Sequence, residues 1–125
     1  MTEFATQQLG NVALIAAEGR LDALVSPRLE EMLKQVLEGG RSRLVVDLAR
    51  VIYVSSSSLR VLLLGARWSR ERGGDLKICC LSPRVLQVFA LAGFDQVFDI
   101  KETREQALAA FAVSPGGPGQ PCSSA

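Results

Sequence analysis

The spacing of hydrophobic and polar positions changes several times along the chain, and each change marks a predicted element. Residues 3–9 and 12–18 are two β-type segments on either side of Gly10 and Asn11, which predicts a hairpin with a tight turn. The first segment is less apolar than the second and alternates weakly. It is therefore expected to form an edge strand.

A helix is predicted to begin at Ser26 and Pro27, because serine caps a helix N-terminus and proline is tolerated in the first turn. The glycines at 39–40 end it. Glu30 and Lys34 lie four positions apart on the polar side, where they form a favourable pair. One apolar stripe at helical spacing faces the core: Leu29, Met32, Leu33, Val36 and Leu37.

Strands and helices are then predicted to alternate. The apolar run at 43–47 predicts a buried strand, and the serines at 55–58 open an apolar helix that ends near 73–74. Ser82 and Pro83 repeat the helix-start signal. The other predicted elements are a strand at 75–80, a helix after Pro83 through Ala92, a strand at 96–100, and a helix from Thr103, in a capping box with Gln106, to about 112.

This order predicts an α/β fold with one mixed, mostly parallel sheet, an N-terminal antiparallel hairpin strand and about four helices. The chain has 125 residues, of which 48% are hydrophobic, and this length suits one domain, predicted at 1–112. Proline, glycine and serine dominate residues 113–125, which predicts a disordered tail.

Charge and targeting signals narrow the class of partner. The chain has 14 basic and 13 acidic residues, so there is no electrostatic reason to expect nucleic acid or a membrane surface as a partner. The N-terminal segment lacks the basic start and apolar run of a signal peptide, and no apolar segment approaches the roughly 20 residues that span a bilayer. The expected location is the cytoplasm.

Histidine is absent, which removes serine–histidine and cysteine–histidine catalysis and the commonest metal ligand. We therefore expect no catalytic residues, no metal and no cofactor. Cys79 and Cys80 are neighbours in a predicted strand, so their side chains are expected to point to opposite faces and not to bridge. Both are expected to be reduced, largely buried thiols, and Cys122 in the tail an exposed one.

Four consecutive serines, Ser55 to Ser58, follow a second apolar patch at 51–54 and open the second helix. A helix N-terminus has unpaired N–H groups and a partial positive charge, so a phosphate there is stabilised. The simpler alternative is a polar loop with a helix cap. A serine hydrolase would need a base that this chain lacks.

The helix after the serines is apolar on two sides. Leu59, Leu62, Leu63 and Ala66 share the face expected to pack on the sheet, whereas the nearly opposite face carries Val61, Leu64, Gly65 and Trp68. Either a neighbouring helix or the tail covers that second face, or it binds a partner or a second copy. Under the second interpretation, Val61, Leu64 and Trp68 contact the partner, flanked by Arg60 and Arg67.

Several segments together resemble the STAS domain of anti-sigma factor antagonists. Residues 47–60 read DLARVIYVSSSSLR, similar to the family pattern D-L-S-x-V-x-F-x-D-S-[ST]-G-L-G. The GRLD at 19–22 resembles the family's G-x-L-D, and the segments at 81–83 and 91–94 also resemble the family. The resemblance covers about residues 4–112.

The resemblance implies a non-enzymatic switch. In that family, the antagonist binds an anti-sigma factor that is usually a serine kinase, phosphorylation of the antagonist ends the complex, and a phosphatase resets it. The phosphoacceptor falls on Ser56 and its hydroxyl neighbour on Ser57. Asp22 falls on a loop aspartate near the family's partner-binding surface.

The chain departs from the family pattern at three positions in or beside the serine run. Ser55 stands for the motif aspartate, Ser58 for its glycine and Arg60 for the second glycine. These three residues are also expected at the partner-binding surface. An antagonist that binds without phosphorylation, a constitutively bound STAS subunit of a signalling scaffold or transport-associated complex, and a homodimer stay open, while a small-ligand binder ranks lowest.

Overall fold

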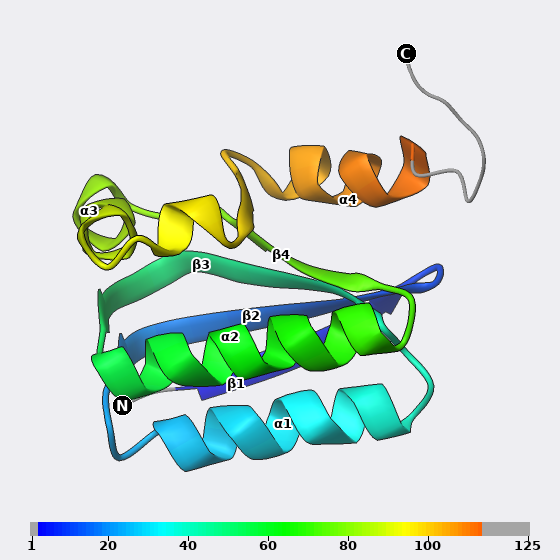
Figure 1. Ribbon diagram of the computed structural model, residues 1–125, viewed down its shortest axis with the longest axis horizontal. Coiled ribbons are helices and arrows are strands. Elements are labelled where there is room, and N and C mark those ends of the chain that lie inside the picture. Colours follow the sequence, from blue (N-terminus) through cyan, green and yellow to red (C-terminus); the bar gives the residue numbers. More distant parts are fainter. Residues whose placement is uncertain (1–2, 114–125) are drawn as a thin grey trace.

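The computed structural model describes residues 3–113, which form one five-stranded sheet and four α-helices (Figure 1). The strand order is β1-β2-β3-β4-β5, with β1 antiparallel to β2 and the other pairs parallel. The predicted fold class is therefore confirmed. The elements are β1 (Glu3–Leu9), β2 (Val12–Leu21), α1 (Ser26–Glu38), β3 (Arg43–Val54), α2 (Ser56–Glu71), β4 (Asp75–Cys79), α3 (Pro83–Leu91), the 3-10 helix η1 (Phe94–Gln96), β5 (Asp99–Lys101) and α4 (Arg104–Val113).

Helices cover both faces of the sheet, with α1 and α2 side by side on one face (Figure 1). The predicted stripe of α1 is confirmed, since Leu29, Leu33 and Leu37 are buried and Lys34 pairs with Glu30 at 3.3 Å. Because strand side chains alternate between faces, a second and smaller core lies under α4. It contains Val12, Leu14, Val45, Cys79, Ala107 and Phe111.

The central strand β3 is much longer than predicted. We expected it to end at Asp47, but it continues to Val54, directly before the serines. Strand β4 pairs with β3 only as far as Asp47, and beyond that point β3 pairs with β2 alone. Strand β2 likewise runs past its predicted end to Leu21, with two register shifts in this pairing. The serine run therefore lies beyond the point where the pairing between β3 and β4 ends.

The prediction of a strand at 96–100 was wrong for the first half of that segment. Gly93, in a left-handed conformation with φ 78°, ends α3, and the chain then turns through η1 before β5 begins at Asp99. Phe98 packs edge-on against Phe89 and Phe94, with ring centroids 5.8 and 6.1 Å apart. Phe98, from the first half of the predicted strand, thus packs against α3 instead of extending the sheet.

Two of the three predicted helix caps are confirmed. Ser82 accepts a hydrogen bond from the Val85 N–H at 3.3 Å, and Thr103 accepts one from the Gln106 N–H at 3.1 Å. The Gln106 side chain accepts from Glu102, one residue earlier than the capping box predicts. The prediction for Ser26 was wrong, because Ser26 is already helical and Val25 occupies the cap position without a side-chain bond.

Strand β4 ends one residue before its predicted end, and this changes the geometry of the two cysteines. Cys80 adopts φ 66° and leaves the strand, so it does not alternate with Cys79 as expected. Both thiols are free, as predicted, with Cys79 buried and Cys80 half-buried. Cys122 lies outside the described residues.

An ion pair under α4 predicts sensitivity to acid. The Lys77 ammonium lies 2.7 Å from Asp99 Oδ2 and 4.7 Å from the centre of the Phe111 ring. Burial acts to raise the pKa of Asp99, but hydrogen bonding and charge from Lys77, then from Lys101, lower it overall from 3.8. Because the pKa falls on folding, this pair stabilises the fold at neutral pH, and that contribution disappears as the pH falls below about 4.

We therefore expect Asp99→Asn to be less stable than wild type at neutral pH, and to lose less stability than wild type between about pH 5 and pH 3. Urea denaturation across this range measures both effects. The exposed carboxylate variant Glu105→Gln is the control and should follow the wild-type curve. If the free energy of unfolding of Asp99→Asn changed with pH in the same way as that of wild type does, the Lys77–Asp99 pair would not be a source of the acid sensitivity.

Candidate functional site

The four serines occupy four different positions at the end of β3 and the start of α2. Ser55 is the N-cap of α2, with extended backbone angles (φ −86°, ψ 165°). Its hydroxyl accepts a hydrogen bond from the Ser58 N–H at 3.2 Å, and its carbonyl accepts one from the Leu59 N–H at 3.0 Å. Ser56 is the first helical residue. The structural role of each serine thus follows from its place relative to the helix start.

A hydroxyl network ties this helix start to α1. The Ser26 hydroxyl lies 2.9 Å from the Ser57 hydroxyl and 3.0 Å from that of Ser58, and it donates to the Asp22 carbonyl at 3.1 Å. The Ser57 and Ser55 hydroxyls are 3.0 Å apart. Ser58 is completely buried and Ser26 nearly so. The hydroxyl of Ser26 therefore fixes the N-termini of α1 and α2 relative to each other.

Ser56 differs from the other three serines because its side chain is exposed. Among the hydrogen bonds of residues 3–113, none involves its hydroxyl. The first turn of α2 also contains no acidic residue, so the positive end of the helix dipole is not offset there. Of the two predicted phosphoacceptors, Ser56 is accessible, whereas Ser57 is half-buried and hydrogen bonded.

The three departures from the family motif are compatible with this geometry. Ser55 supplies the capping oxygen without the charge of an aspartate. Ser58 fits as a buried helical residue whose hydroxyl meets that of Ser26, and Arg60 is exposed on α2. Because Ser58 is completely buried, we no longer expect it to contact a partner directly.

The second apolar face of α2 is largely covered by α1. Val61 is 4% exposed, and Leu33 of α1 lies so close that a Cβ on Gly65 would approach its Cδ1 to 2.8 Å. Trp68 is half-buried, with the Lys34 ammonium 5.7 Å from the centre of its ring. The expected partner contact at Val61 is therefore corrected, because a neighbouring helix occupies that side.

The outer side of α2 stays open to solvent. Leu64 is half-buried there, between the exposed Arg60 and Arg67. These side chains border a surface hollow of about 540 Å³ whose lining combines two leucines, three arginines and one glutamate. Its lining residues are Arg60, Leu63, Leu64, Arg67, Arg70 and Glu71.

Large apolar side chains are also exposed at the carboxyl ends of β2 and β3. Leu24, in the β2–α1 loop, is 87% exposed, and Ile52 and Tyr53, at the end of β3, are 64% and 41% exposed. Parallel strands β2 and β3 end at one edge of the sheet, next to the starts of α1 and α2 (Figure 1). We call the residues that are exposed at this end of the sheet, Leu24, Ile52, Tyr53, Ser56 and Arg60, the Ser56 surface.

The sequence prediction missed the three apolar members of this surface and assigned Asp22 a direct role. The Asp22 carboxylate accepts hydrogen bonds from the Leu24 and Val25 N–H groups at 3.1 and 3.2 Å. Asp22 therefore shapes the loop that presents Leu24. Hydropathy alone cannot separate an exposed apolar residue from a core residue, which is why Leu24 and Ile52 were not identified.

Removal of the Ser26 hydroxyl should destabilise the fold. In Ser26→Ala, the buried Ser58 hydroxyl keeps only a long contact of 3.5 Å to the Asp22 carbonyl. We expect a loss of about 1–3 kcal/mol in the free energy of unfolding, measured by urea denaturation. The matched control is Ser56→Ala, which removes an exposed hydroxyl and should change stability by less than about 0.5 kcal/mol. Equal stability of the two variants would contradict a structural role for the network.

Comparison with known proteins places this geometry in a family. A family model described as "Mlab, STAS domain" matches residues 4–102. BtrV of Bordetella bronchiseptica, a candidate anti-sigma factor antagonist by its name, is 36% identical over 104 residues, which cover 83% of this chain and 90% of that protein. An anti-sigma-B factor antagonist of Listeria monocytogenes is 33% identical over 89 residues, covering 70% of this chain and 76% of that protein.

Solved structures agree on the fold. The anti-sigma factor antagonist SpoIIAA in its unphosphorylated form superposes with a TM-score of 0.77 at 19% identity, covering 88% of this chain and 96% of that one. The phosphorylated form of the Bacillus protein superposes with a TM-score of 0.69 at 18% identity, covering 87% and 99%. Within residues 3–113, no helix combines the length and apolar character needed to cross a bilayer.

Proposed function

The chain belongs to the STAS domain family, with anti-sigma factor antagonists among its relatives, and from this premise we propose that it binds an anti-sigma factor through the Ser56 surface and is released by phosphorylation of Ser56. The partner would be an anti-sigma factor with serine kinase activity, and a phosphatase would restore the binding form. Such a switch would act in the cytoplasm. It works by protein–protein contact, and we assign no catalytic residue.

One observation carries the proposal: of the four serines that open α2, Ser56 alone is exposed. A kinase must bring a hydroxyl into its own active site, which an exposed residue at a helix start permits. The hydroxyls of Ser57 and Ser58 are already committed to the contact with Ser26. Their phosphorylation would require that the link between α1 and α2 open first.

The fold should tolerate a phosphate on Ser56. Phosphorylation adds a charge of about −1.5 to −2 at the positive end of the α2 dipole. Arg60 lies four residues later on the same helix, which is the spacing at which helical side chains pair. The modified residue thus meets favourable charges within its own helix, so loss of the partner would not need unfolding.

The same phosphate opposes docking. Leu24 and Ile52 are exposed at the same end of the sheet, and their contact with a partner would exclude water. A phosphate at the edge of such a contact loses hydration on docking, and this costs free energy unless the partner supplies a cation. A charge that is tolerated in the free domain and costly in the complex shifts the equilibrium toward release.

The motif departures do not remove the elements on which the switch depends. Ser55 still caps the helix, and Arg60 adds a positive charge beside the acceptor serine. The structural neighbour SpoIIAA has been solved in both unphosphorylated and phosphorylated forms, so this fold accommodates the modified state in that protein.

Capture of the partner tests the proposal. The full chain, immobilised through its C-terminus, is incubated with lysate of its own cells, and the retained proteins are identified by mass spectrometry. We expect an anti-sigma factor of the serine kinase type, and less of it on a Leu24→Ser, Ile52→Ser variant of unchanged fold. If the immobilised chain retained only a scaffold or transport complex, and ATP did not change the amount retained, the result would contradict the switch and favour a constitutively bound subunit.

A further inference from the structure

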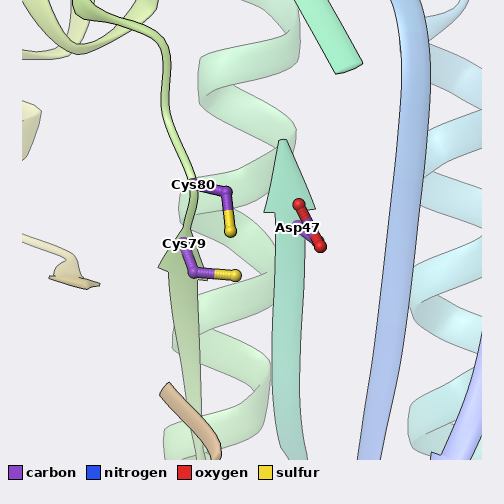
Figure 2. A group of neighbouring side chains, drawn as sticks. All are labelled: Asp47, Cys79 and Cys80. Atoms are coloured by element: carbon purple, nitrogen blue, oxygen red, sulfur yellow. The ribbon is translucent and has the colours of Figure 1, made fainter. Parts of the chain in front are cut away.

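Three potential metal ligands meet on the α4 side of the sheet, away from the Ser56 surface. The side chains of Asp47, Cys79 and Cys80 converge where β4 ends beside β3, part-way along β3 (Figure 2). One ligand atom of each, a carboxylate oxygen or a sulfur, lies within 4.8 Å of the other two. Asp47 and Cys79 are buried and Cys80 is half-buried. The cluster is therefore largely enclosed, with one edge accessible.

The register of the sheet and one backbone dihedral bring these residues together. Asp47 of β3 and Cys79 of β4 are register partners, so their side chains share a face. Cys80 would normally point to the other face, but φ 66° turns its side chain back toward Asp47. Within residues 3–113, Cys80 is the sole non-glycine residue with a positive φ. This conformation disfavours ordinary side chains and is concentrated at functional sites.

Asp47 is held in a fixed orientation. Its Oδ2 accepts hydrogen bonds from Arg104 Nε at 3.0 Å and Nη2 at 2.7 Å, and its Oδ1 accepts one from the Ala49 N–H at 2.9 Å. Carboxylate oxygens have further acceptor positions. Hydrogen bonds that orient a ligating carboxylate are a regular feature of metal sites.

We propose that Asp47, Cys79 and Cys80 bind one thiophilic divalent cation of the zinc and cadmium class. Two sulfurs and one carboxylate oxygen suit a tetrahedral ion of this type, with the fourth position left open at the accessible edge. Tetrahedral zinc–sulfur bonds of about 2.3 Å place two sulfurs roughly 3.8 Å apart. The two sulfurs would therefore approach each other by about 1 Å or less, within reach of side-chain rotation.

Charge balance supports a divalent ion. Binding follows M²⁺ + 2 RSH → M(SR)₂ + 2 H⁺, so one ion replaces the two thiol protons. The group of Asp47, Cys79, Cys80 and Arg104 is neutral before this exchange and stays neutral after it. A largely buried cluster can therefore take the ion without gaining net charge, which would be costly in a poorly hydrated site.

Alternative roles for the two thiols fit less well. Cys79 is buried and Cys80 half-buried, so neither thiol has the open, electropositive surroundings typical of a reactive cysteine. A disulfide between adjacent residues is also disfavoured, because neighbouring Cα atoms are about 3.8 Å apart and disulfides usually need 4.4 Å or more. Both thiols thus stay available to a metal ion.

Cadmium titration of the reduced full chain tests the proposal. Thiolate-to-cadmium charge transfer gives an ultraviolet absorption band that reports sulfur ligation directly. We expect this band to saturate at one ion per chain, and zinc to displace cadmium and abolish it. Cys122→Ser is the matched control, because it removes the one cysteine outside the cluster and should leave the band and the affinity unchanged.

Cadmium binding by variants of Asp47 and Cys80 should show whether the cluster is a metal site or only a pair of buried thiols. We expect Cys80→Ser to weaken cadmium binding at least tenfold and to reduce the band. Asp47→Asn should weaken binding about tenfold or more while retaining the band, since both sulfurs remain. Circular dichroism of the metal-free proteins checks folding. Absence of the band in folded wild type, its loss in Cys122→Ser, or wild-type affinity in Cys80→Ser would overturn the proposal.

Discussion

Replacement of Ser56 by glutamate is expected to weaken binding of the anti-sigma factor at least about 30-fold, equivalent to about 2 kcal/mol. The carboxylate is placed at the exposed start of α2, at the end of the sheet where Leu24 and Ile52 are also exposed. It would lose hydration when the partner docks, as the phosphate would. Titration of the captured partner against both proteins, by calorimetry, measures the change in Kd.

Ser56→Gln provides the matched control, because glutamine has nearly the size of glutamate without its charge. We expect its Kd to lie within about threefold of wild type, since surface substitutions typically change free energies by less than about 0.5 kcal/mol. Both variants should unfold at the wild-type urea concentration, as Ser56 makes no contact in the core. If glutamate and glutamine weaken binding equally, size rather than charge matters and the switch mechanism fails.

The largest loss of stability is expected at Gly74, in the turn between α2 and β4. A Cβ at this position would lie 1.9 Å from the Ser42 carbonyl oxygen and 2.4 Å from its carbon. These are backbone atoms of the residue directly before β3, and the Asp75 N–H donates to the same carbonyl at 3.0 Å. Relief of the clash must move a strand start, so Gly74→Ala should cost about 3 kcal/mol or more.

The adjacent Gly73 is the natural control. It has φ 85°, but a Cβ there would meet no atom within 4 Å. Gly73→Ala should therefore cost only about 1–2 kcal/mol, the usual penalty for a left-handed residue with a side chain. Urea denaturation measures the free energy of unfolding of both variants. The loss in Gly74→Ala reports the steric clash, and the loss in Gly73→Ala reports the backbone strain. A Gly74→Ala protein as stable as Gly73→Ala would show that the turn can shift without loss.

The order of helices and strands was predictable because each amphipathic or apolar segment was long enough to show its period. The stripe of α1 and the caps at Ser82 and Thr103 are local features of the sequence. The extent of β3 was not predictable in this way. Its second half includes the exposed Arg50, Ile52 and Tyr53, and it is a strand because β2 pairs with it. Pairing of this kind depends on tertiary contacts rather than on hydropathy.

The site was predictable in its position but not in its details. The serine run marked the start of α2, yet only the packing of α1 against α2 decides that Ser26 meets Ser57 and Ser58, and thereby leaves Ser56 free. The same packing removed Val61 from the surface. The cysteine cluster depends on a single dihedral at Cys80, which interrupts the strand alternation assumed from the sequence.

The central claim is that Ser56 is the residue through which a kinase controls binding. The most direct measurement is phosphopeptide mapping by mass spectrometry, on protein purified from its own cells and on protein incubated with the captured anti-sigma factor and ATP. We predict one phosphate, on Ser56, in both samples, and none on Ser57 or Ser58. Phosphate on Ser57, or a bare serine run after incubation with an active kinase, would contradict the proposed switch.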